Sequence, residues 1–382
     1  MMAMKRFIIY FLLFSVGFWS CITEIRDFEQ IDSAAFLTVE ATLSNQKGPH
    51  KVVLSFSSPS IKINVDNVPV KNAQVFITDD KGGRETLSET DNGIYVTSAT
   101  YQGVVGNAYT LHINLSNGKK YESSPEILKA APAIDTVKYQ FSVKDNYPLT
   151  DSRSVGFDVT LDFKDSPEAD NYYQWKWTHY ERTVFCASCE RGYDYSLKKC
   201  SIEQNFPQGQ TFPELINYGC NETCFDISFN ETYNILSDKL MNGQQVTNYP
   251  IARVPYNNKS IYYLKIEQRA ISEKMFRYFR SIKDVTQGSG TLFDVPAETQ
   301  FSPNMVSLSD PNEKILGAFQ VFGSQEKIIY VDRQIGTLNY SPVLVVYQGR
   351  VLPPPPGAIS GPKAYCVEGK YRTKTEPEAF KE

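Results

Sequence analysis

The sequence predicts an all-β protein in which an N-terminal immunoglobulin- or fibronectin-like sandwich is followed by a larger β-domain with one clear helix and a cysteine-rich insertion. Three observations predict this class. Aromatic residues make up 13% of the chain and are mostly Tyr and Phe, which favour half-buried, pleated strands. Apolar and polar residues alternate with a period of two in many short segments. Turn residues separate these segments at short intervals, as in β-sandwiches.

Residues 1–20 have the pattern of a bacterial lipoprotein signal peptide. Two basic residues precede the apolar run 7–16, and Ser20 stands directly before Cys21. We therefore expect cleavage before Cys21, which would carry the lipid as the first mature residue. Phe18 departs from the pattern, because lipoprotein signals more often have Leu or Val there. Ordinary secretion with cleavage near Ser20 is the alternative.

Lipid at Cys21 would hold the protein on a membrane without crossing it. No other stretch reaches the ~18 apolar residues that a transmembrane helix needs. Residues 21–33 are polar and mixed, and we interpret them as a tether between the lipid and the folded part.

Residues 34–126 are predicted to form the sandwich. Apolar residues alternate in 37–43, 52–56 and 109–113, and Asn92-Gly93 is typical of a hairpin turn. The proline-containing stretch 125–132 is the predicted domain boundary.

Residues 127–350 are predicted to form the second β-domain. Alternation is cleanest over 155–163, and further strands are expected at 262–266, 316–321 and 328–331 among others. A helical period near 272–285 follows Ser272, a suitable N-cap residue. A last strand is expected at 343–347. Residues 351–382 are predicted to be a spacer and a C-terminal tail, because the four prolines at 353–356 favour an extended chain.

One aromatic strand allows two interpretations. Alternate residues of a strand face opposite sides, so the odd-numbered aromatics are expected in the core. The others could offer a stacking surface to a sugar or a partner chain. The set is Tyr172, Tyr173, Trp175, Trp177 and Tyr180.

Six cysteines remain besides Cys21, and five of them lie in the insertion 185–225. An even number in an exported protein favours three disulfides, although the sequence does not choose among the pairings. Four of them could instead bind zinc, but their irregular spacing and the oxidising compartment argue against a metal. The six are Cys186, Cys189, Cys200, Cys220, Cys224 and Cys366. The insertion is also the region where we expect a contact surface.

The sequence offers few candidate catalytic residues. The chain has only His50, His112 and His179, no two of them at metal-ligand spacing, and no nucleophile, phosphate-loop or calcium-loop motif. His112 is expected on the solvent side of its strand. A hydrolase with two carboxylates about 5 to 10 Å apart stays open as a weaker hypothesis. The net charge of −4 gives no reason to expect nucleic acid, and no cofactor is expected.

Several stretches resemble the Bacteroidetes-type lipoproteins described as domain of unknown function 4249. They are 75–82, 93–95, 106–111, 118–123, 263–268, 271–272, 290–296, 315–319 and the tail 375–380. The resemblance implies a surface lipoprotein of the outer membrane, facing the cell exterior, that acts beside a TonB-dependent receptor. It assigns no activity.

We therefore expect a non-enzymatic, lipid-anchored protein that binds a small ligand, peptide or glycan, or serves as an accessory to a TonB-dependent transporter. The alternative is a surface adhesin or an envelope-structural module that binds other proteins.

Overall fold

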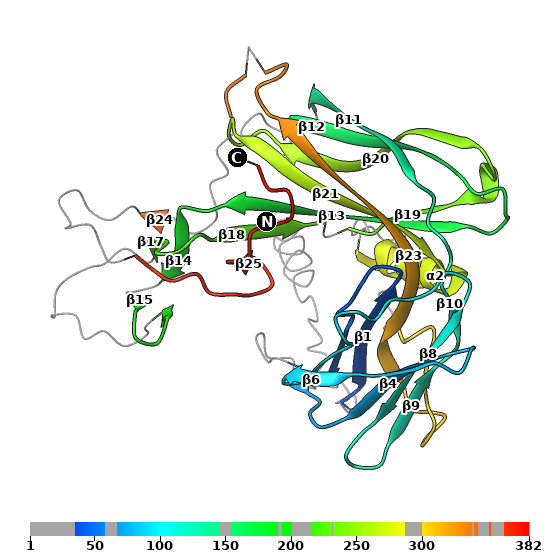
Figure 1. Ribbon diagram of the computed structural model, residues 1–382. Helices are drawn as coiled ribbons and strands as arrows, with labels where there is room; N and C mark the ends of the chain where they lie inside the picture. The colour runs from blue at the N-terminus through cyan, green and yellow to red at the C-terminus, as the bar shows by residue number, and fades with distance from the viewer. Residues whose placement is uncertain are drawn as a thin grey trace, which may run out of the picture.

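The computed structural model describes residues 35–57, 67–145, 154–189, 193–200, 215–230, 232–286, 300–337, 340–342, 351–352 and 363–381. These residues form a protein built mostly of strands with a single α-helix, which confirms the predicted fold class. An N-terminal sandwich lies at the bottom of Figure 1, a second β-region lies above it, and one long strand, β23, joins them. The predicted features at 1–33, 343–347 and 353–356 lie outside the described residues.

The sandwich consists of two sheets. In the first sheet the order β6–β7–β2–β1–β23 is extended by β3, which pairs with β2. Its strands are β1 (Leu37–Ser44), β2 (Lys51–Phe56), β3 (Val68–Pro69), β6 (Ser88–Asp91), β7 (Ile94–Val96) and β23 (Ile315–Asp332). The second sheet has the order β22–β9–β8–β4–β5, with β10 paired to β8. Its strands are β4 (Gln74–Asp79), β5 (Arg84–Thr86), β8 (Ala108–Asn114), β9 (Lys120–Ser123), β10 (Glu126–Ile127) and β22 (Met305–Ser307).

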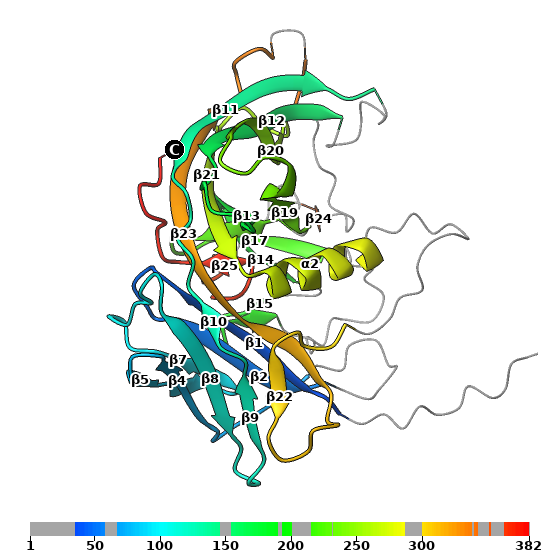
Figure 2. The same cartoon turned by 90° about the vertical axis from the view of Figure 1, so that its right-hand side faces the viewer.

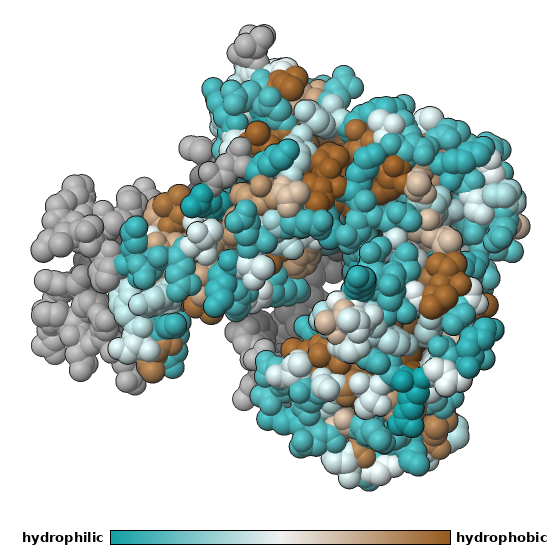
Figure 3. Space-filling view, viewed as in Figure 1, coloured by the Kyte–Doolittle hydropathy of each residue, from teal (hydrophilic) through white to brown (hydrophobic). Residues whose placement is uncertain are grey.

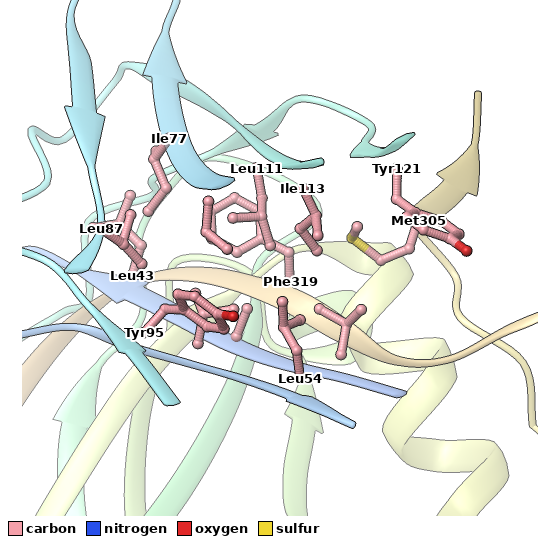
Figure 4. Packing of buried hydrophobic residues seen from close by; sticks show 14 of the residues in the cluster. Leu43, Leu54, Ile77, Leu87, Tyr95, Leu111, Ile113, Tyr121, Met305 and Phe319 are labelled. Carbon is pink, nitrogen blue, oxygen red and sulfur yellow. The ribbon is translucent and has the colours of Figure 1, made fainter. Parts of the chain in front are cut away.

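Alternating side chains fill the space between these sheets. In β1 the side chains of Leu37, Val39 and Ala41 are buried, whereas Glu40 between them faces outward. Figure 4 shows the packing, in which Leu54 and Tyr95 of one sheet meet Ile77, Leu111 and Ile113 of the other. The sandwich prediction is therefore confirmed.

The sandwich also includes residues that the sequence analysis assigned to the second domain. Strand β22 pairs with β9, and the first half of β23 pairs in parallel with β1, from Leu37 opposite Ile315 to Ser44 opposite Phe322. Met305 and Phe319 point into the sandwich core (Figure 4). The division at 126/127 therefore does not separate the two bodies, because a sheet edge accepts any strand of suitable pattern, however distant in the chain.

The second half of β23 belongs to the second region, where it pairs antiparallel with β21. Figure 2 shows β23 running from the upper region down into the sandwich. The large sheet continues through β21, β13, β18 and β25, with β19 also paired to β13. These strands are β13 (Tyr172–Arg182), β18 (Phe225–Phe229), β19 (Asn234–Ser237), β21 (Ile261–Ile271) and β25 (Arg372–Thr373).

A three-stranded sheet packs on one face of this large sheet. Its strands, in the order β11–β12–β20, are β11 (Ile134–Val143), β12 (Val155–Lys164) and β20 (Gln245–Pro255). Phe163 of β12 lies 5.3 Å from Tyr173 and 5.6 Å from Trp175, centroid to centroid, in the apolar core between the sheets.

Helix α2 (Glu273–Thr286) covers the opposite face where β23 leaves the sandwich (Figure 2). The Ser272 hydroxyl accepts a hydrogen bond from the backbone N–H of Met275 at 3.3 Å, as predicted for the N-cap. Met275 and Phe279 are buried against Tyr172 and Phe322 of the large sheet. A short 3₁₀ helix, η1 (Asp238–Leu240), follows β19. Among the described residues, neither helix is long and apolar enough to cross a membrane.

The insertion forms a separate lobe, which projects to the left in Figure 1. Strand β17 lies between β14 and β24, and β15 pairs with β16. The strands are β14 (Phe185–Cys189), β15 (Tyr193–Asp194), β16 (Lys199–Cys200), β17 (Leu215–Gly219) and β24 (Val351–Leu352).

Candidate ligand-binding cleft

The aromatic strand β13 has two buried faces at its beginning. Tyr173 and Trp175 are each 1% exposed in the core beneath the three-stranded sheet, as the odd-numbered positions predict. Trp177 packs partly against the same core. Tyr172, on the other face, is also buried, because α2 lies over it with Phe276 4.9 Å away, centroid to centroid. Tyr172 is therefore not part of an exposed stacking surface.

A cleft of about 600 Å³ lies where β1, β13 and α2 approach one another. We call it the junction cleft. Its walls are residues of β1 and β2, one lysine of β13, aromatic residues of α2 and of the segment before β19, and three residues of β23. The lining residues that matter for its chemistry are Glu40, Thr42, Lys176, Tyr233, Tyr278 and Gln320. Figure 3 shows the surface hollowed between the sandwich and the second region.

The β-pleat explains why these polar groups share one side. Strand β13 turns Tyr173 and Trp175 toward the core, so Gln174 and Lys176 point the opposite way. The residues opposite them on β21 are Arg269 for Gln174 and Glu267 for Lys176.

Lys176 is the central charge of the junction cleft. Among the described residues it has no hydrogen-bond or ion-pair partner. Burial, and then the positive charge of Arg269, lowers its pKa to about 8, although the carboxylates of Glu267 and Glu40 act in the opposite direction. Its ammonium group is therefore held in a site that compensates its charge only in part.

Arg269, next to the cleft, is also incompletely paired. Its Nη2 donates to Glu267 Oε2 at 2.5 Å, and its guanidinium lies 4.0 Å from the centroid of the Phe322 ring. Its Nε and Nη1 are buried and have no hydrogen-bond partner in the described part of the chain. The amide oxygens of Gln174 and Gln320 are likewise buried and have no hydrogen-bond partner among the described residues. Buried polar groups are normally paired, so this concentration on one face calls for an explanation.

A second pocket, of about 570 Å³, lies where the insertion leaves β13 and includes Glu181 and Lys381. Glu181, its most buried charged group, is partnered, because it accepts from Asn258 Nδ2 at 3.0 Å. The neighbouring His179 is the main group that lowers the pKa of Glu181, and Arg333, which is fully buried, donates to Ser260 O at 2.7 Å. This arrangement resembles a structural network, so we regard the junction cleft as the stronger candidate site.

The six cysteines of the insertion and tail form three disulfides, which confirms that prediction. The pairs are Cys186–Cys220, Cys189–Cys200 and Cys224–Cys366. The sulfur atoms of Cys186, Cys224 and Cys366 lie within 4.8 Å of one another, so two of the disulfides are adjacent. Two of the disulfides lie within the lobe, and the third links the lobe to the C-terminal tail. Cys21 lies outside the described residues.

The three histidines lie in separate packing environments, each against a different aromatic ring. His112 is on the outer side of β8, stacked on Phe76 at 4.6 Å between centroids. His50 is buried in the sandwich region, and burial lowers its pKa. His179 stacks on Tyr262 at 3.5 Å.

Sequence reasoning missed Lys176 and Arg269. A signal was present, because Lys176 interrupts the most aromatic strand of the chain at a position where a buried neighbour was expected on each side. The role of Lys176 depends on Glu40 and α2, which line the same cleft, and no local sequence pattern reveals that they meet there.

Comparison with known proteins supports the resemblance found in the sequence. No curated protein matches the chain. A family model described as domain of unknown function (DUF4249) matches residues 23–328, which cover the sandwich, most of the second region and nearly all of β23. The chain belongs to the DUF4249 family.

Proposed function

We propose that this chain is a non-enzymatic surface lipoprotein of the outer membrane that binds a ligand in the junction cleft and serves as an accessory to a TonB-dependent transporter. The observation that supports ligand binding best is the set of polar side-chain atoms, at and beside that cleft, that have no partner within the described part of the chain. Concave sites with a few convergent polar groups are typical of ligand pockets.

The compartment is supported by two features. Disulfides persist in oxidising environments, and this chain has three. The lipoprotein pattern around Cys21 accounts for export and for a membrane attachment without a spanning helix.

The insertion is the proposed contact surface for the transporter. Its lobe projects from the body (Figure 1) and exposes large apolar side chains near the disulfides. Val184 is 75% exposed, Leu197 62% and Tyr371, on the attached tail, 60%. Exposed large apolar side chains on a lobe cross-linked by disulfides favour a protein partner.

A pull-down tests the accessory role. The tagged protein is extracted in mild detergent and everything retained is identified by mass spectrometry. We expect a stoichiometric barrel-sized receptor, and we expect Val184→Asp with Tyr371→Asp to lose it. Leu240→Asp, which changes a 95% exposed leucine on η1, is the matched control and should retain it.

The alternative is a surface adhesin, for which the same exposed lobe would bind other proteins. Retention of other surface proteins or glycans, without a receptor, would favour the adhesin and contradict the accessory role.

A separate variant tests the anchor: Cys21→Ala should move the protein from the membrane fraction to the soluble fraction with an unchanged circular dichroism spectrum. Membrane retention of this variant would contradict lipid attachment at Cys21.

A further inference from the structure

We propose that the junction cleft recognises a carboxylate group on a small organic ligand, with Lys176 as the direct contact and Arg269 as the neighbouring cation. This inference rests on the proposed ligand-binding function and names the ligand class.

Lys176 lines the cleft with no hydrogen-bond or ion-pair partner among the described residues. Arg269 lies beside the cleft rather than in its lining, and its buried Nε and Nη1 lack acceptors in the same part of the chain. A carboxylate has two oxygen atoms that together accept several hydrogen bonds, so it supplies the acceptor that Lys176 lacks, and its charge is also attracted by the Arg269 guanidinium. The nearby Glu267 binds Nη2 of Arg269 instead of Lys176.

The charges around Lys176 set the charge of the group that would be bound. Glu267 and Arg269 of β21 and Glu40 of β1 act on its ammonium group, and Lys51 of β2 lines the same cleft. With Lys176 these five groups add to a charge of about +1 when all are ionised. A single carboxylate balances this charge, whereas a doubly charged phosphate would leave a net charge of about −1.

Aromatic residues of the cleft wall indicate what the body of the ligand would be. Tyr233 and Tyr278 line the cleft, and Tyr233 stacks on Phe279 at 4.9 Å between centroids. Burial raises the pKa of both tyrosines, so their hydroxyls remain neutral donors at physiological pH. An aromatic wall with neutral hydroxyls fits a sugar ring or an aromatic side chain. The carboxylate could therefore come from a uronic sugar or from an amino acid.

The test compares each carboxylate with its uncharged amide. The probes are glucuronate against glucuronamide, and N-acetylphenylalanine against its amide, with inorganic phosphate as the anion control. Binding to the full mature chain is measured by calorimetry at pH 7. We expect at least one acid to bind tenfold or more tightly than its amide, and the acid that does so identifies the source of the carboxylate.

Variants then assign the contact. Lys176→Met should weaken binding of the acid at least tenfold, Lys176→Arg should keep part of it, and Lys120→Met, an exposed lysine of β9, should leave it unchanged. Binding should also weaken as the pH rises through about 8, because Lys176 then loses its charge. Lys176→Met should lose this pH dependence, which a merely structural role of the lysine would not produce.

Several outcomes would overturn the inference: neither acid binding better than its amide, phosphate binding as tightly as the acids, or Lys176→Met binding normally. These results are independent of the pull-down. Carboxylate binding without a retained receptor would contradict the accessory role alone, and a retained receptor without carboxylate binding would contradict the ligand class alone.

Discussion

The two faces of the sheet formed by β13 and β21 differ in how completely their polar side chains are hydrogen-bonded. Toward the three-stranded sheet, Trp175 packs with Leu264 and Ile266, and its Nε1 donates to Gln268 Oε1 at 2.9 Å. The Gln268 amide in turn donates to the Pro132 carbonyl at 2.8 Å, so the polar groups around Trp175 are satisfied.

The opposite face uses the same strands in the same register. Gln174 stands opposite Arg269, and Lys176 opposite Glu267, yet several of their polar atoms have no partner in the described structure. Because a strand alternates between two environments, one face can supply stability while the other keeps unpaired polar groups. Such groups are costly for stability, and proteins often accept that cost at functional sites.

The largest effect is expected on the satisfied face. Trp175→Ala removes a fully buried indole and leaves Gln268 without its donor, so we expect a loss of about 3–5 kcal/mol in the free energy of unfolding. Urea denaturation measures it. Tyr371→Ala, at a 60% exposed ring, should cost less than about 1 kcal/mol. Similar losses for the two variants would contradict the claim that this buried face supplies stability.

The satisfied face could be predicted from the sequence. Tyr173, Trp175 and the run 155–163 alternate with the period of a pleated strand, and this period alone places them in a core. The capped helix after Ser272 followed from equally local signals. The disulfides could be predicted as a set, but their pairing depends on how distant segments meet.

The other face could not be predicted, because its chemistry is assembled from distant parts of the chain. Glu40 and Lys176 reach one cleft only because β23 pairs with β1 at one end and with β21 at the other. The alternation in β23 shows that it is a strand but does not choose its partners. The predictions for Cys21 and for the partner remain predictions.

A smaller effect is expected where the cleft wall depends on backbone conformation. Gly317 lines the junction cleft with φ of +78°, and a Cβ at this position would collide with the carbonyl oxygen of Val39. Gly317→Ala should cost about 1–3 kcal/mol, measured by thermal unfolding, and should distort the cleft. Gly118→Ala is the control, because Gly118 has φ of +88° with no atoms near its Cβ position. An equal cost would mean that the contact with β1 does not matter.

Replacing Lys176 is expected to raise the free energy of unfolding, whereas the two preceding substitutions lower it. Its pKa in the folded protein, about 8, lies below the ordinary value of 10.5, so the unfolded chain binds more protons between these pH values. The stability of the wild-type protein should therefore rise as the pH increases from about 8 to 10.5. Lys176→Met should be more stable by about 1–2 kcal/mol at pH 7 and should lack this rise, as chemical denaturation across the pH range would show. A destabilised Lys176→Met would indicate that the polar face contributes to stability after all.

The smallest expected effect is a change in the pKa of Lys176 when a neighbouring carboxylate is removed. Glu267 and Glu40 both raise the pKa of Lys176, and Glu267 is the stronger of the two. Glu267→Gln removes that carboxylate, so the pKa of Lys176 should fall below about 8, and Glu40→Gln should lower it by less. The measurement is a titration of the ¹³C-methylated lysine signals by NMR, with Lys176→Met identifying the relevant resonance. An unchanged pKa in Glu267→Gln would mean that Lys176 lies too far from the β21 charges to share a ligand with Arg269, and recognition of a carboxylate would then depend on Lys176 alone.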